Sequence, residues 1–190
     1  MTLIRDGLRA LRLTAVLWLI TVVLYTLPIL AIGQGLLPFQ ANGSLLRVDG
    51  TVVGSALVGQ PFASDRYFWS RPSAVDYSTG TQPSSGPSNL GPTNPELVKR
   101  IGANAAALQK GGLGNPAPDL LYSSGSGLDP HISPLAAAQQ LERVAANRNL
   151  RAQQLRPLIQ RHTEGRSLGL LGEARVNVLE LNLDLDRLTR

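Results

Sequence analysis

Residues 13–32 read LTAVLWLITVVLYTLPILAI, and this uncharged stretch decides the architecture of the chain. Twenty residues of α-helix span about 30 Å, which matches the hydrocarbon core of a bilayer. No other stretch is long and apolar enough to cross a membrane, so the sequence excludes a transporter with several spans. It predicts one N-terminal transmembrane helix.

The charges that flank this helix predict its orientation. Three arginines and a single acid precede it, namely Arg5, Arg9, Arg12 and Asp6, and no further charge occurs before Arg47. Because cytoplasmic flanks carry the excess of Lys and Arg, we expect the N-terminus in the cytoplasm. The predicted parts are a cytoplasmic tail at 1–12, a transmembrane signal anchor at 13–33 and an extracytoplasmic α+β domain at 34–190.

A cleaved signal peptide is the alternative to an anchor. Ala31-Ile32-Gly33 has small residues in the right places for cleavage. The apolar run, however, exceeds the 7–15 residues that are typical of a signal-peptide core. We therefore favour an uncleaved anchor.

The composition of the chain excludes several classes of functional site. The 190 residues carry a net charge of +5, with scattered arginines and no cysteine. Without cysteine, a disulfide scaffold, a thiol nucleophile, an iron–sulfur cluster and a Cys-ligated zinc site are excluded. Scattered arginines without interleaved aromatics disfavour nucleic-acid binding. No P-loop, DKTG, HExxH or GxSxG motif occurs, so we do not expect this chain to form an aspartyl-phosphate itself.

Local patterns after the anchor predict both strands and helices. Asp49-Gly50 between short apolar runs indicates a β-hairpin. Asn94-Pro95 and Ser133-Pro134 each join a capping residue to a favourable first helical residue, which predicts helices ending near Gly111 and Asn147.

Other stretches leave their structure more open. Ser73–Pro95 is rich in Ser, Gly and Pro and predicts a long loop, and Leu120–Tyr122 indicates a short strand. A third helix is expected over about 150–162, where Pro157 either kinks it or marks its start. Arg175–Leu188 fits either a bulged strand or a strand that passes into a helix.

Candidate catalytic residues are few. A serine-hydrolase arrangement can be assembled from Ser124 or Ser126 with His131 and Asp129. Asp129-Pro130-His131 is too local for the usual triad, and two such side chains do not make a metal site. The structural interpretation is that Asp129 and His131 organise the turn before Ser133. We predict no catalytic residue and no metal site.

An aromatic segment is the main candidate for a binding surface. Arg66 and Arg71 bracket Tyr67-Phe68-Trp69, which holds three of the nine aromatic residues. Trp, Tyr and Arg dominate the energetics of interfaces, which favours a contact surface for a partner. A core strand with flanking charges is an equally good interpretation.

Seven motifs follow one another along the chain: QANGSL (40–45), GSALVGQ (54–60), YFWSRPS (67–73), SSGPSNLGP (84–92), SGSGLDPHIS (124–133), QLERVA (140–145) and RVNVLELN (175–182). In this order they resemble the C subunit of the Kdp high-affinity potassium-transporting ATPase, the KdpC family. The resemblance runs from the anchor to about Asp186. The candidates for partner contact on these motifs are Tyr67, Phe68, Trp69, Arg71, Asn89, Gln140 and Arg143.

The resemblance implies an accessory, non-catalytic subunit of an ATP-driven potassium-uptake complex in the bacterial inner membrane. The implied partners are a channel-like potassium-translocating subunit, a P-type ATPase subunit and a small single-span subunit. The family is described as a catalytic chaperone that raises the affinity of the ATPase subunit for ATP. Because our topology places residues 34–190 outside the cytoplasm, we expect no tightly bound cofactor and an effect on ATP through the complex.

Two other classes of function remain open at this point. One is a membrane-anchored extracytoplasmic serine hydrolase that uses Ser124 or Ser126. The other is a solute-binding or receptor module without a pump. An exposed serine within hydrogen-bond distance of a histidine would favour the hydrolase.

Overall fold

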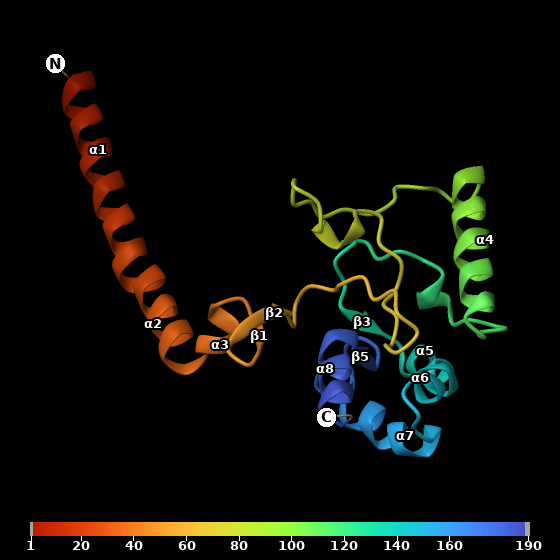
Figure 1. The fold of residues 1–190 in the computed structure, drawn as a ribbon. Helices are drawn as coiled ribbons and strands as arrows, with labels where there is room; N and C mark the ends of the chain where they lie inside the picture. Colours follow the sequence, from red (N-terminus) through yellow and green to blue (C-terminus); the bar gives the residue numbers. More distant parts are fainter. Residues whose placement is uncertain (1, 189–190) are drawn as a thin grey trace. The chain divides into compact units, whose positions relative to one another are not determined.

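The computed structural model describes residues 2–188 and divides into two compact units, which separate between Leu45 and Leu46 (Figure 1). Residues 34–45 thus belong with the N-terminal unit, although the sequence pattern assigns them to the domain. The second unit has its own apolar core.

The N-terminal unit contains the predicted single apolar helix. It is built from α1 (Thr2–Thr21), a π-helical stretch η1 (Val22–Thr26) and α2 (Leu27–Leu36), and the short α3 (Pro38–Ala41) follows. Leu3–Leu36 is the one described helix that is long and apolar enough to cross a membrane. The helix starts well before Leu13, so most of the predicted tail is helical.

The π-helical stretch has a local cause. Leu27 donates its N–H to the carbonyl of Val22, five residues back, immediately before Pro28. Proline has no N–H to continue the regular i to i−4 ladder and its ring crowds the preceding turn. A local π-bulge is one of the usual ways in which a helix absorbs such an interruption.

The hairpin predicted at Asp49-Gly50 is present. β1 (Leu45–Val48) and β2 (Thr51–Ser55) pair in a two-stranded sheet. Asp49 and Gly50 have φ angles of 49° and 80°, the positive values that a two-residue type I′ turn requires.

The rest of the second unit is a small sheet with helices packed against it. The antiparallel strands β3 (His131–Ile132), β5 (Arg175–Asn177) and β4 (Thr163–Glu164) lie in the order β3-β5-β4, with Ile132 opposite Val176. The surrounding helices are α5 (Pro134–Gln139), α6 (Leu141–Asn147), α7 (Ala152–Arg161) and α8 (Val178–Leu188). Figure 1 shows α8 beside β5, and α7 contacts both α6 and α8. The α+β expectation is confirmed.

Helix caps occur where the sequence predicts them. Asn94 accepts from the N–H of Glu96 at the start of α4 (Pro95–Lys110), and Ser133 accepts from Ala136 at the start of α5. In both caps the capping side chain accepts from an N–H two or three positions ahead, which satisfies a free N–H group of the first helical turn.

Three local expectations are resolved by the structure. Leu120 ends a 3-10 turn, η3 (Pro118–Leu120), so the short strand predicted at Leu120–Tyr122 is wrong. Pro118 begins that turn, because its fixed φ suits a first helical position.

The two open alternatives are also settled. Pro157 lies inside α7 and does not mark its start. At the C-terminus a strand passes into a helix, and Asn177 accepts from the N–H of Glu180 at the junction.

Candidate partner-contact site

The Tyr67–Trp69 segment is held by two side-chain amides, one from a helix and one from the turn between two helices. No strand within residues 2–188 pairs with it, but Asn182 of α8 accepts from the Phe68 N–H (2.9 Å) and donates to the Phe68 carbonyl (2.9 Å). Gln140, between α5 and α6, accepts from the Trp69 N–H (2.7 Å) and donates to the Trp69 carbonyl (3.2 Å). These amides satisfy backbone groups that a neighbouring strand would otherwise bind, so the segment is rigidly placed.

Arg143 of α6 braces the same segment from another side. It donates to the carbonyls of Asp65 (2.8 Å) and Tyr67 (3.0 Å), and its guanidinium lies 3.6 Å from the centroid of the Trp69 ring. Burial lowers the pKa of Arg143 to about 10 although Asp65 opposes this shift. Arg143 is therefore still a cation at neutral pH and can make a cation–π contact with Trp69.

Tyr67 is held by a second arginine. Arg148 donates to the Arg66 carbonyl (2.7 Å), pairs with Asp186 of α8 (2.6 Å) and lies 4.7 Å from the centroid of the Tyr67 ring. The Tyr67 hydroxyl donates to the same carboxylate (3.0 Å).

Sequence reasoning names Gln140 and Arg143 but misses Asn182, Arg148 and Asp186. Asn182 could have been recognised from its place in the sequence, because it is a polar residue within an apolar pattern, beside Leu181 and about one turn before Leu185. All three positions are buried in α8. A buried amide needs partners, and here the partners are backbone groups more than one hundred positions away.

The structure corrects two of the contact candidates. Phe68 and Gln140 have no exposed surface, so they belong to the interior and support the segment from beneath. Tyr67, Trp69 and Arg71 are half-buried, and Asn89 is exposed on the loop before α4. Arg143 is half-buried as a residue, but only 7% of its side chain is exposed, so it supports the Trp69 ring. The surface candidates are therefore Tyr67, Trp69, Arg71 and Asn89, and their contact with a partner stays a prediction.

Trp69 also lines an open, mostly apolar groove of about 300 Å³. Its lining includes Phe62, Pro72, and Ala107 and Leu108 of α4. Gly111 closes over the ring, because a Cβ at this position would lie 2.4 Å from a ring carbon of Trp69. The groove and the braced indole together present an aromatic edge of the kind found at interfaces.

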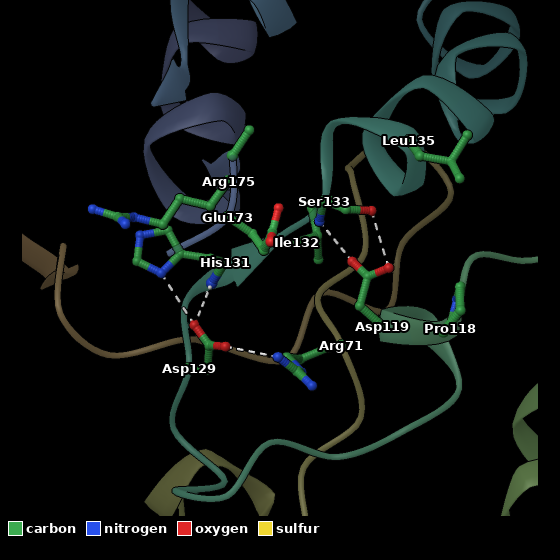
Figure 2. Close-up of a pocket in the computed structure, with 11 residues that line it drawn as sticks. Arg71, Pro118, Asp119, Asp129, His131, Ile132, Ser133, Leu135, Glu173 and Arg175 are labelled. Atoms are coloured by element: carbon green, nitrogen blue, oxygen red, sulfur yellow. Dashed lines mark hydrogen bonds and ion pairs between the residues drawn. The ribbon is translucent and has the colours of Figure 1, made fainter. Parts of the chain in front are cut away.

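A second polar cluster surrounds Asp129 (Figure 2). Arg71 donates to one carboxylate oxygen of Asp129 (2.7 Å), while the other accepts from the His131 N–H (3.0 Å) and faces His131 Nδ1 (3.1 Å). Arg71 is fixed in turn by Tyr77, whose hydroxyl donates to the Arg71 carbonyl. Burial raises the pKa of Tyr77 to about 12, which keeps the hydroxyl protonated as a donor.

This cluster lines an open cleft of about 520 Å³, whose lining also includes Asp119 and Ser133, to the right of Asp129 and His131 in Figure 2. Asp119 accepts from both the N–H and the hydroxyl of Ser133 (2.6 and 3.0 Å), so it reinforces the cap of α5. The structural interpretation of Asp129 and His131, that they organise the turn before Ser133, fits these contacts.

We expect Asp129→Asn to remove an acid-sensitive part of the stability. Burial alone would raise the pKa of Asp129, but hydrogen bonds from His131 and the charge of Arg71 outweigh it, so the pKa is lowered from 3.8. A lowered carboxyl pKa contributes stability above its unfolded value, which is lost as the pH falls through the folded value. Unfolding measured between pH 7 and pH 2 should depend less steeply on pH below about 4 in the variant.

The matched control for Asp129→Asn is Glu142→Gln, an exposed acid on α6. It should keep the acid sensitivity of the unaltered protein. An Asp129→Asn protein whose pH dependence equals that of the control would contradict the assigned role of the Arg71–Asp129 pair.

The serine-hydrolase arrangement is not assembled. Ser124 Oγ accepts from the Gly127 N–H (2.8 Å) and Ser126 Oγ accepts from the Leu128 N–H (3.1 Å), so both hydroxyls tie down their own loop. Neither serine is hydrogen-bonded to His131 within residues 2–188. The same residues contain no group of three potential His, Asp or Glu metal ligands.

Comparison with known proteins covers nearly the whole chain. Residues 7–187 match the family model of the K+-transporting ATPase c chain, KdpC. A Synechocystis protein named potassium-transporting ATPase KdpC subunit is 54% identical, over 97% of this chain and 99% of its own length. Proteins of the same name are 52% identical in Anabaena (98% and 95% covered) and 53% identical in Methylococcus capsulatus (94% and 96% covered).

Proposed function

The chain belongs to the KdpC family of K+-transporting ATPase c chains, and from this premise we propose that it is an accessory, non-catalytic subunit of an ATP-driven potassium-uptake complex. The observation that carries the proposal is the match over residues 7–187, which includes both the apolar helix and the domain. The proposed partners are the channel-like potassium-translocating subunit, the P-type ATPase subunit and the small single-span subunit of that complex.

We propose that the helix over Leu3–Leu36 anchors the subunit in the bacterial inner membrane. The arginines before the apolar run favour an N-terminus in the cytoplasm and a second unit outside it. Residues 13–46 contain no Asp, Glu, Lys, Arg or His, so the apolar run lacks the concentrated polar ligands that a permeating cation needs. The anchor therefore positions the domain near its partners and does not carry potassium.

The domain makes the specific contact in this proposal. Trp69 stands at a groove and its backbone and ring are held by Gln140 and Arg143, so little conformational freedom is lost when a partner binds. An effect on ATP affinity is then transmitted by favouring one conformation of the ATPase subunit. Direct binding of ATP by the extracytoplasmic domain is not part of this proposal.

The test is the potassium-stimulated ATPase activity of the purified complex at a series of ATP concentrations, with and without this chain. We expect the complex without the chain either to fall apart or to need more ATP for half-maximal activity. Trp69→Ala should shift the ATP dependence in the same direction, and Tyr122→Ala, an exposed aromatic outside the groove, should not. An intact complex with the same ATP dependence in every sample would refute the proposal.

A further inference from the structure

The loop between β4 and β5 presents leucines to solvent. Leu168, Leu170 and Leu171 are 92%, 81% and 64% exposed, whereas most of the other leucines of the second unit are buried or half-buried. Single exposed apolar residues are common, but three within four positions at one loop tip form a patch. The role proposed above for the Trp69 groove does not involve this tip.

The tip is ordered by its own hydrogen bonds. Ser167 donates to the Leu171 carbonyl (2.8 Å) and Leu171 donates back to Ser167 (2.9 Å), which closes a small hairpin. Leu168 and Gly169 have φ angles of 55° and 75°, in the left-handed region that turns the chain sharply. The backbone therefore holds the leucines outward and prevents their collapse onto the domain.

The stem below the tip is charged but neutralised pairwise. Arg166 binds Glu173 (2.9 Å), and one step further from the tip Glu164 binds Arg175 (2.7 Å). Residues 167–172 contain no charge. Along the hairpin, an uncharged apolar end is thus followed by two ion pairs. This order matches the passage from hydrocarbon to polar headgroups at a bilayer surface.

We propose that the tip at Leu168–Leu171 inserts into the outer layer of the same bilayer that the anchor crosses. A tip of three leucines is too small for a stable protein interface, which buries about 800 Å² per partner. A weak contact suffices here, because the anchor keeps the domain at high effective concentration near the membrane. The contact would be a second, reversible attachment that limits how the domain rotates on its anchor.

The absence of cysteine allows a direct test on the full-length chain. In the Leu170→Cys variant, a fluorophore is attached to the single cysteine, and the protein is studied in vesicles of phosphatidylcholine and phosphatidylglycerol. Nitroxide-labelled lipid and iodide in the buffer are then compared as quenchers. We expect the lipid quencher to reduce emission from position 170 and iodide to have little effect.

Three labelled controls make the result decisive. Val98→Cys, an exposed apolar position on α4, should show the opposite pattern, which excludes insertion driven by the fluorophore. Leu24→Cys in the anchor should be quenched by lipid, which verifies that the chain is inserted. Leu168→Ser and Leu171→Ser, introduced together beneath the label at 170, should restore iodide access, because each lost leucine weakens insertion by roughly tenfold.

Iodide access at position 170 equal to that at position 98, in vesicles where position 24 is quenched by lipid, would overturn the proposal. Protection of position 170 that appears only when the other Kdp subunits are added, without lipid quenching, would also overturn it and would assign the tip to a protein partner.

Discussion

Asn182→Leu should destabilise the domain by about 2–6 kcal/mol, since it leaves the buried N–H and carbonyl of Phe68 without partners and each orphaned group costs about 1–3 kcal/mol. Leucine has the same branching and the same number of side-chain heavy atoms as asparagine, so the loss of hydrogen bonds dominates the effect. In detergent micelles, thermal unfolding followed by circular dichroism should show a midpoint lower by more than about 5 °C. The aromatic segment should loosen with it, because Asn182 is what ties Phe68 to α8.

The matched control is Asn147→Leu on α6. Asn147 also donates to a carbonyl, that of Arg143, but it does so at the surface, where water can replace the bond. Its unfolding midpoint should change by no more than about 2 °C. If the two variants unfolded at the same temperature, the amide of Asn182 would not hold the segment as described.

Deleting residues 34–190 should abolish the complex even though the anchor still inserts. The specific contacts proposed for this subunit lie in the domain, whereas the anchor supplies proximity and general helix packing. Conversely, replacing Leu13–Ile32 by an unrelated apolar helix of equal length should retain much of the complex. Co-purification of the partner subunits with each protein measures both outcomes.

A reporter that is active only outside the cytoplasm, fused after Arg190 or after the truncated end, controls for insertion in the same experiment. It should be active in the unaltered chain, the helix replacement and the truncation. A cytoplasmic C-terminus in the unaltered chain would reverse the proposed topology. Loss of the complex on replacing the helix, together with its retention on deleting the domain, would reverse the proposed division of roles.

Features that depend on near neighbours were predictable from the sequence. The apolar helix, the Asp49-Gly50 turn and the caps at Asn94 and Ser133 all follow from residues within a few positions, since backbone preference and first-turn hydrogen bonds are local. The KdpC resemblance likewise rests on motifs that can be read along the chain.

The roles of the site residues were decided only by the tertiary structure. Phe68 is apolar and Gln140 is polar, yet both lie in the interior, because the backbone beside Phe68 finds its partners on α8 and Gln140 turns inward to meet Trp69. The alternating leucines of 179–185 are compatible with a strand as well as with a helix. In the structure β5 ends at Asn177, and these leucines belong to α8, which packs on α7. Burial depends on contacts between residues far apart in sequence, and no local sequence pattern specifies which distant residue will contact a given position.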